Sequence, residues 1–446
     1  MDSLRETRHS AAARLDRLPI GLFHRRAMRL LGYVFFFELG DINTFGFAAP
    51  AIREAWGLSI STIGFVTSAT FVGMFLGATS AGWISDRIGR KRALILTTLW
   101  YSGFSLLNAV AWNTTALLIT RLLTGVGLSG ATVVAITYIS EMFPAAKRGS
   151  YQGWIMTIGL CGIPVTAYVA RFLIPMGAWG WRAVFVWGAL GLLFPLFARH
   201  LEESPRWYEH HGRLQDADAV LARIEQQIRN EVGELPPVTA VAPVTSQDHA
   251  SLRELVAGGY LKRLILFIAI WIFQTLGFYG FMSWVPTLLA ANGFSVVHAL
   301  ERSSAISIGA VPGAWLAAKI SDRWERKWLI TAVSLVVAVC GLIYGLSFQT
   351  ATIVIFGFLV AMFIQTFAPL LYAYTPESFP TSVRNTSTGV GYGIGRLANA
   401  FGPIFVAFLF THYGYTSVFV YIAFCWGMVA LLVASFGPST KGRVLT

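Results

Sequence analysis

Charged residues are scarce in this chain: Asp, Glu, Lys and Arg make up 13% of its 446 residues, whereas hydrophobic residues make up 55%. Soluble globular proteins carry roughly 25% charged residues. A soluble core could not hide this much apolar surface, so the composition excludes an ordinary soluble domain and predicts a protein that crosses a membrane several times. The three cysteines lie far apart inside apolar runs, which excludes a disulfide framework and a cysteine metal site.

Features of several other functional classes are also missing. The sequence has no nucleotide-binding motif and no nucleophile–base or metal-ligating constellation, so we expect no enzyme, no direct ATP coupling and no cofactor. The N-terminal segment lacks an apolar core, so no cleavable signal peptide is expected. The formal net charge is +12, but membrane proteins concentrate positive charge in their cytoplasmic loops, so no nucleic-acid partner is expected either.

Twelve apolar runs have the length of about 20 residues that a membrane-spanning helix needs. They cover 29–51, 61–83, 93–112, 115–141, 152–175, 182–199, 263–290, 303–320, 328–348, 351–376, 386–411 and 415–437. The sequence therefore predicts an all-α membrane protein with two six-helix bundles, 29–199 and 263–437. Between them lies a hydrophilic loop, 200–262, and the flanks are an N-terminal segment, 1–28, and a tail, 438–446.

Two patterns refine this organisation. In the loop, apolar residues recur at helical spacing and predict an amphipathic helix: Ala217, Val220, Leu221, Ile224 and Ile228. If the N-terminus is inside, most Lys and Arg fall in cytoplasmic segments, whereas the outside loops hold only Arg53, Arg182 and Arg302. Because cytoplasmic loops are enriched in positive charge, both termini are predicted to be cytoplasmic.

The two halves of the chain repeat each other at an offset of 236 residues. The matching residues are Pro50 with Pro286, Ser59 with Ser295, Ser85-Asp86-Arg87 with Ser321-Asp322-Arg323, Arg90-Lys91 with Arg326-Lys327, Tyr138 with Tyr374, Glu141 with Glu377, Pro144 with Pro380 and Arg148 with Arg384. Duplicated six-helix halves are typical of transporters that bind their substrate near the membrane midplane, between the halves, and open alternately to either side.

These motifs resemble a known family. Gly82–Arg92 resembles the signature loop of the major facilitator superfamily, and Arg121–Gly127 and Tyr138–Pro144 resemble the fourth helix of its sugar-porter-like members. Glu203–Trp207 resembles the motif after their sixth helix, and Leu15–Pro19 is similar to bacterial proton symporters for organic acids, including nicotinate porters and the related synaptic-vesicle-protein-like and organic-ion transporters. The resemblance implies a twelve-helix major facilitator fold in a bacterial inner membrane, a monomer, and transport driven by the proton gradient.

Ionisable residues within the spans are candidate functional groups, because burying charge in a bilayer is costly. Glu38 and Asp41 lie three residues apart on the first span and share a helical face. The resemblance pairs Asp41 with Arg121 on the fourth span as a proton-coupling site, and Glu38 is a second candidate carrier. The alternative is a static ion pair that holds two helices together. Arg171, near the end of the fifth span, is predicted to be an interfacial side chain.

Arg396 on the eleventh span is the main candidate for substrate binding. Its guanidinium offers the planar, bidentate geometry that recognises a carboxylate, and Tyr392 and Asn399 share its face. Among the organic-ion transporters that the chain resembles, those with a basic residue on this helix transport anionic substrates. The alternative is a salt bridge to a carboxylate on another helix, of which Glu38 is the nearest candidate.

The seventh and tenth spans favour a flat or apolar ligand. Tyr279 stands where the resemblance to sugar porters would place asparagine, and Phe367 and Tyr372 stand where it would place tryptophan. Rings that replace amide hydrogen-bonding groups argue against a polyol. The remaining predicted contacts to the substrate are Gln274, Gln365 and Trp154; packing or lipid contact is the alternative for each aromatic residue.

Charged residues at the cytoplasmic helix ends form a predicted inner gate. By resemblance, the gate comprises Asp86, Arg90, Glu141 and Arg148 and their repeat mates Asp322, Arg326, Glu377 and Arg384. Such networks would latch the outward-open state and break on the inward swing. The alternative is that these charges serve the topology alone.

Together, these features predict a symporter that imports a proton and a small, aromatic monocarboxylate such as nicotinate. A sugar or polyol symporter is an alternative that the fourth-helix and Glu203–Trp207 motifs favour. An exporter of the same fold is another, because the sequence does not fix direction. A membrane receptor without transport is disfavoured by the gate motif and the buried acids.

Overall fold

The computed structural model describes residues 10–238, 260–321, 323–380 and 383–439. The described part of the chain is built from helices joined by short loops and contains no strand. Nine of its helical segments are long and apolar enough to cross a membrane. Helix α2, which carries buried charges, helix α4, and the broken pair α14–α15 complete the twelve spans of the predicted fold.

The N-terminal half contains the first six spans, the short helix α1 before them and the two loop helices α9 and α10 after them. Its elements are α1 (Ala11–Asp16), α2 (Leu22–Trp56), α3 (Ile60–Ile88), α4 (Arg90–Ala109), α5 (Thr114–Met142), α6 (Ala145–Leu173), η1 (Ile174–Met176), α7 (Gly180–Gly188), η2 (Ala189–Leu193), α8 (Phe194–Ala198), α9 (Pro205–His210) and α10 (Leu214–Val232). The predicted amphipathic helix is α10, and its five predicted apolar residues are buried.

The C-terminal half contains the other six spans, three of which are interrupted. Its elements are α12 (Leu261–Met282), α13 (Val285–Ala291), α14 (Val296–Ser307), α15 (Ala310–Ile320), α16 (Arg326–Leu346), α17 (Thr350–Glu377), α18 (Arg384–Ala398), α19 (Gly402–Tyr413) and α20 (Tyr415–Phe436). The breaks lie just before Pro286, Pro312 and Pro403. A proline has no amide hydrogen to donate to the preceding turn, so the helix restarts near it.

The internal repeat is visible in how helices begin. Ser59 Oγ accepts the Thr62 amide at the start of α3, and its repeat mate Ser295 does the same for the His298 amide at the start of α14. Serine is a favoured N-cap because its hydroxyl satisfies an amide that has no partner within the helix. The sequence repeat therefore encodes equivalent helix starts in both halves.

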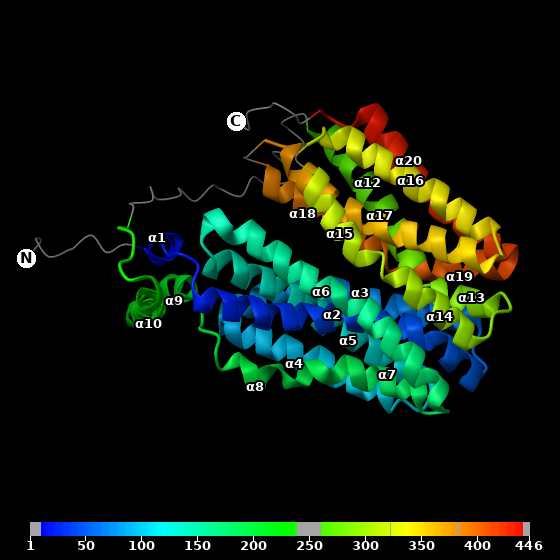
Figure 1. Ribbon diagram of the computed structural model, residues 1–446, viewed down its shortest axis with the longest axis horizontal. Coiled ribbons are helices and arrows are strands. Elements are labelled where there is room, and N and C mark those ends of the chain that lie inside the picture. Colours follow the sequence, from blue (N-terminus) through cyan, green and yellow to red (C-terminus); the bar gives the residue numbers. More distant parts are fainter. Residues whose placement is uncertain (1–9, 239–259, 322, 381–382, 440–446) are drawn as a thin grey trace, which may run out of the picture.

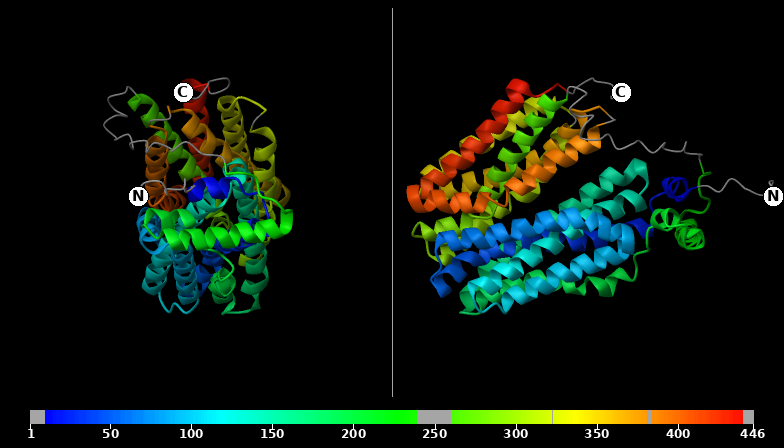
Figure 2. Two further views of the ribbon diagram at one scale, coloured as in Figure 1. Left: turned by 90° about the vertical axis from the view of Figure 1, so that its left-hand side faces the viewer. Right: turned by 180° about the vertical axis from the view of Figure 1, so that it is seen from behind.

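The two halves form separate helical bundles that lie against each other (Figure 1). We call the end at which α1 and the last turn of α20 lie the terminus side, and the opposite end the far side. The halves are in contact on the far side, through α2 with α13, α6 with α14 and α3 with α19. Toward the terminus side the bundles diverge (Figure 2).

Within the N-terminal half, α3 and α5 pack with their backbones in close approach. A methyl group at Gly77 would collide with the Val126 carbonyl oxygen, and one at Gly125 would collide with the Thr70 carbonyl oxygen. Small residues let membrane helices approach closely where lipid tails provide no hydrophobic driving force. This packing fixes Arg121 on α5 against α3.

Helices α1 and α10 are joined by an ionic cluster on the terminus side. The Arg14 guanidinium donates to both carboxylate oxygens of Glu225, at 3.0 and 2.8 Å, and Arg17 donates to Glu225 at 2.9 Å. Burial raises the pKa of Glu225, but the hydrogen bonds and positive charges of the two arginines outweigh burial and hold this pKa below its ordinary value. The cluster therefore binds the N-terminal segment to the loop helix.

Candidate functional site

Asp41 and Arg121, the predicted proton-coupling residues, lie close together in the interior of the N-terminal half. Both are almost fully buried, and Asp41 Oδ2 lies 3.8 Å from Arg121 Nη1. The other carboxylate oxygen, Oδ1, accepts hydrogen bonds from Ser105 Oγ at 2.6 Å and Thr44 Oγ1 at 3.3 Å. Asp41 Oδ2 has no hydrogen-bond partner in the described structure. The 3.8 Å contact between Asp41 Oδ2 and Arg121 is thus an ion pair without a hydrogen bond. Oδ2 is the carboxylate oxygen that is available to take up a proton.

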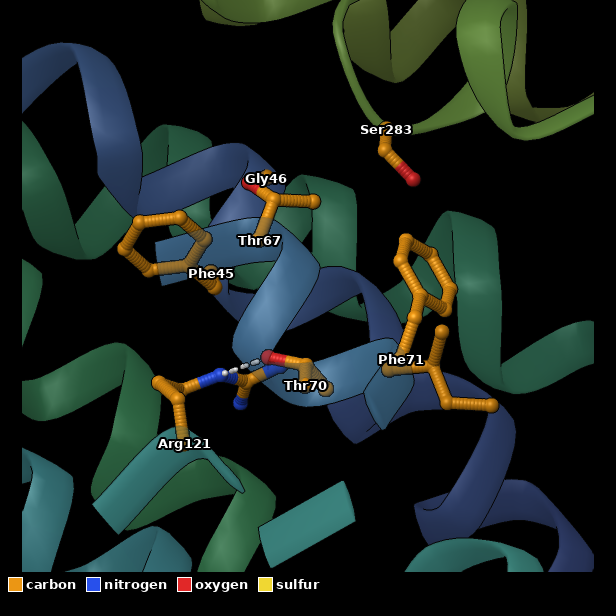
Figure 3. A pocket seen from close by; sticks show the side chains of 8 residues that line it. Phe45, Gly46, Thr67, Thr70, Phe71, Arg121 and Ser283 are labelled. Carbon is orange, nitrogen blue, oxygen red and sulfur yellow. Dashed lines mark hydrogen bonds between the residues drawn. The ribbon is translucent and has the colours of Figure 1, made fainter. Parts of the chain in front are cut away.

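A small pocket lies beside this pair (Figure 3). In the close-up, Arg121 Nε donates to Thr70 Oγ1, at 3.2 Å, and Ser283 enters from the C-terminal half. The lining comes from α2, α3, α5 and the end of α12: Ile42, Phe45, Gly46, Thr67, Thr70, Phe71, Arg121 and Ser283. Residues of both halves therefore surround the arginine, so a movement between the halves would change its surroundings.

Glu38 lies one helical turn from Asp41 and has a different set of neighbours. It is 3% exposed, and its Oε1 accepts a 2.7 Å hydrogen bond from Thr132 Oγ1 on α5. Its Oε2 is buried and has no hydrogen-bond partner in the described residues. Glu38 interacts electrostatically with Arg396 of the other half, but the described structure shows no ion pair between them.

Arg396 is surrounded by aromatic rings of the C-terminal half. Its Nε donates to Tyr392 Oη at 2.8 Å, and its guanidinium lies 5.0 Å from the centre of the Tyr392 ring. Tyr372 packs against Tyr392 with ring centroids 5.8 Å apart, and Tyr279 is within electrostatic range of Arg396. Arg396 Nη1 is buried and has no hydrogen-bond partner in the described structure. The predicted arginine and three predicted tyrosines therefore form one cluster, which we call the arginine–tyrosine cluster.

The other predicted substrate contacts differ in their surroundings. Asn399 is 1% exposed, and neither end of its amide has a hydrogen-bond partner in the described residues. Gln274 and Gln365 are buried, and the Gln274 carbonyl accepts a hydrogen bond from Thr275 at 3.2 Å. Trp154 is 61% exposed, and no described contact joins it to the arginine–tyrosine cluster. The structure brings the tyrosines to Arg396 but does not bring Trp154 there.

The predicted gate residues of the N-terminal half form a network on the terminus side. Arg90 donates to Asp86 at 2.6 Å and to both carboxylate oxygens of Glu141, at 2.9–3.1 Å. Arg148 donates to the Phe143 carbonyl and lies 3.9 Å from Asp16 of the N-terminal segment. All of these contacts stay within one half.

One gate contact of the N-terminal half recurs in the C-terminal half. Arg326 forms an ion pair with its repeat-related partner Glu377 at 3.0 Å. Arg384 Nε and Nη2 are buried and have no hydrogen-bond partner in the described residues. Asp322 lies outside the described residues. On the terminus side, the ion pairs Arg90–Asp86, Arg90–Glu141 and Arg326–Glu377 each connect residues of the same half.

Comparison with known proteins places this architecture in a family. The profile of the sugar (and other) transporter family matches residues 28–446. The chain belongs to this family. Its fold matches that of the xylose transporter XylE from Escherichia coli, a major facilitator superfamily protein, with a TM-score of 0.73 over 95% of this chain and 97% of that one, at 20% identity.

Three relatives of this transporter span most of its length. A putative metabolite transport protein, YyaJ, of Bacillus subtilis is 46% identical over 97% of this chain and 96% of its own. The niacin transporter NiaP of Acinetobacter baylyi is 29% identical over 97% and 98%, and a gallate transporter of Pseudomonas putida is 30% identical over 87% and 86%. The relatives are transporters, not enzymes, in agreement with the prediction.

Sequence reasoning missed several residues of the transporter. Glu203 accepts the backbone amides of Arg90 and Lys91 at 2.7–3.1 Å and so caps the start of α4. Its conspicuous position in the Glu203–Trp207 motif was the available signal. Trp271 packs its ring against both Tyr372 and Tyr392, at centroid distances of 5.1 and 5.3 Å.

The other missed feature is an ion pair on the far side. Arg171 Nη2 on α6 donates to Glu301 Oε1 on α14 at 2.9 Å and so connects the two halves. The prediction for Arg171 was an interfacial side chain, and its exposed fraction of 34% fits that position. No sequence signal pointed to Glu301, because the pairing depends on how the halves dock.

Proposed function

We propose that this transporter is a proton-coupled symporter that imports a small aromatic monocarboxylate, such as nicotinate, across the bacterial inner membrane by alternating access. The observation that carries the proposal is the arginine–tyrosine cluster. A buried guanidinium with an unpartnered Nη1 is a binding group for a carboxylate, and tyrosine rings beside it suit a flat ring. The names of relatives that carry niacin and gallate support this substrate class.

Asp41 and Arg121 are the proposed proton site. The carboxylate and the guanidinium stabilise each other when close, and the 3.8 Å pair lies next to a pocket that both halves line. Both groups belong to the N-terminal half, but a movement of the halves removes Ser283 from the pocket and changes the surroundings of the arginine. If the guanidinium then shifts away from Asp41, the acid binds a proton more readily, since the neighbouring positive charge favours its ionised form. Protonation would thereby be coupled to the change of shape.

The orientation follows from the charged loops. With both termini in the cytoplasm, the terminus side is the inner side, and the divergence of the halves there corresponds to an inward-facing state. The intra-half contacts of Arg90 and Arg326 then represent the gate after it has opened. We propose that in the outward-facing state these gate residues exchange partners across the two halves, and that the transporter works as a monomer.

Uptake into proteoliposomes tests the proposal. With an inward-directed proton gradient, we expect accumulation of labelled nicotinate or 4-hydroxybenzoate but not of glucose or neutral nicotinamide. Arg396→Met should abolish binding of the acids and leave the protein folded, whereas Arg396→Lys should retain part of the binding because the charge remains. Glucose-dependent uptake alone would instead support the sugar-porter alternative, and acid binding by Arg396→Met equal to that of the wild type would refute the carboxylate anchor.

A further inference from the structure

Two opposite charges face each other from the two halves without meeting. Glu38 lies midway along α2, and Arg396 lies in the last turn of α18, inside the span Thr386–Tyr413. They interact electrostatically, but the described residues show no salt bridge between them. Since an ion pair forms when the two charged atoms come within 4 Å, the carboxylate and the guanidinium are farther apart than that, and Tyr279 interacts with both of them.

Each charge is only half satisfied by the protein. Glu38 uses Oε1 to accept from Thr132, and Arg396 uses Nε to donate to Tyr392. Glu38 Oε2 and Arg396 Nη1 are buried and have no hydrogen-bond partner in the described structure. A buried unsatisfied group costs free energy, and the cost is larger for charged groups, so such atoms usually mark the place of a ligand or a moving partner.

Aromatic rings occupy the same interface. The ring of Tyr279, from the C-terminal half, packs edge-on against Phe71 of the N-terminal half at a centroid distance of 4.7 Å. Tyr279 is within electrostatic range of both Glu38 and Arg396. Offset and edge-to-face contacts between rings are favourable, so a flat ligand held between the two charges would lie beside aromatic surface.

We infer that Glu38 is a specificity-determining residue that accepts a hydrogen bond from an O–H or N–H donor on the substrate, remote from the carboxylate that Arg396 binds. This inference rests on the proposed function and deepens it: the substrate is an aromatic acid with a second, donating group, as in a hydroxybenzoate, whereas nicotinate carries such a donor only when its ring nitrogen is protonated. Such a ligand gives Glu38 Oε2 and Arg396 Nη1 the partners they lack. It also connects the two halves, so that binding favours their closure around it.

A comparison of ligands and variants tests this inference. Binding of benzoate, 4-methylbenzoate, 3-hydroxybenzoate and 4-hydroxybenzoate is measured by titration calorimetry on the purified wild type, Glu38→Leu and Glu38→Gln. One hydroxybenzoate should bind the wild type at least about tenfold more tightly than benzoate, because a hydrogen bond to a charged group contributes that much. In Glu38→Leu this preference should fall to about twofold or less, while benzoate binding is kept.

Controls separate the roles of the two carboxylate oxygens and of size. Thr132→Val removes the partner of Oε1 but leaves Oε2 in place, so the preference for the hydroxyl should persist. 4-Methylbenzoate should bind like benzoate, since it has the size of the hydroxyl compound without its donor. Should Glu38→Leu fail to fold, Glu38→Gln is measured in its place. Its preference for the hydroxybenzoate over benzoate should be smaller than that of the wild type, because the acceptor is then a neutral amide and not a charged carboxylate.

Other results would overturn the inference. Equal binding of all four acids by the wild type, or an undiminished hydroxyl preference in Glu38→Leu, shows that Glu38 does not contact the ligand. Tighter benzoate binding in Glu38→Leu without any hydroxyl preference in the wild type would instead mean that Glu38 competes with the substrate for Arg396. If the wild type binds none of the four acids, the inference fails, and if it does not bind nicotinate in the same titration either, the proposed function fails with it.

Discussion

The ion pair between Arg171 and Glu301 gives a prediction about the balance between the two faces of the transporter. It joins the halves on the far side, where they are in contact, and would be broken if the halves parted there. The two side chains are 34% and 48% exposed, so the pair belongs to the surface class, which contributes about 0.2–1 kcal/mol. Removing it by Glu301→Gln should therefore shift the equilibrium toward opening on the far side by about 1.4- to 5-fold.

Labelling of a cysteine at the interface measures this shift. Ser283 lines the pocket on α12, and its carbonyl approaches Gly46 of the other half, so Ser283→Cys in a background without the native cysteines reports opening. A membrane-impermeant thiol reagent added from the outside should label Glu301→Gln and Arg171→Gln faster than the parent. The charge-swapped double variant Arg171→Glu/Glu301→Arg should label at the parental rate.

Salt provides a second check on the same pair. Because exposed charges are screened, high ionic strength should speed labelling of the parent and leave the two single variants almost unchanged. The reasoning is refuted if both single variants label at the parental rate, or if the charge-swapped variant is as fast as they are.

Three further predictions concern coupling, pH and packing. Asp41→Asn should abolish accumulation driven by a proton gradient but keep counterflow exchange of substrate; loss of binding altogether would contradict a role in coupling. The pKa of Glu225 is lowered in the folded protein, so its stabilising contribution is complete above the pKa of the unfolded chain, about 4.5, and is lost as the pH falls through the lower, folded value. The protection factor for hydrogen exchange in α10, which is the chemical exchange rate at each pH divided by the measured rate, should therefore fall below about pH 4.5 in the wild type and change little in Glu225→Gln, whereas equal profiles would argue against the ionic cluster. Gly77→Ala should prevent the close approach of α3 and α5 and reduce the yield of folded protein severely, while Gly82→Ala on the same helix, where a methyl group meets open space, should be tolerated; similar yields would contradict the packing argument.

Much of the fold could be predicted because the bilayer imposes strong rules on sequence. A span must be apolar and about 20 residues long, so the twelve runs were visible, and the offset of 236 residues revealed the two halves. The breaks before Pro286 and Pro403 were less visible. An uninterrupted apolar run predicts one continuous helix. In the structure the helix ends before the proline, which lacks an amide donor, and a new helix begins near it.

The charged residues of the candidate site could be predicted from the sequence, because charge is rare in the spans. The aromatic residues could not, because helix packing decides which of them are neighbours. Asp41, Arg121 and Arg396 stand out because charged residues in apolar spans are costly. Trp271 is one aromatic residue among many, and only the fold shows that it touches both Tyr372 and Tyr392. The exposure of Trp154 was likewise hidden, since a helical pattern does not say which neighbour covers each face.

The ionic cluster of Arg14, Arg17 and Glu225 has a consequence for biosynthesis. Its partners lie more than 200 residues apart along the chain, yet all of them precede the end of α10 at Val232. All three residues of the cluster are therefore synthesised before α12, whereas the pair Arg171–Glu301 has to wait for the second half. A fault in the insertion of α12–α20 would therefore remove the contacts between the halves without removing any partner of the ionic cluster.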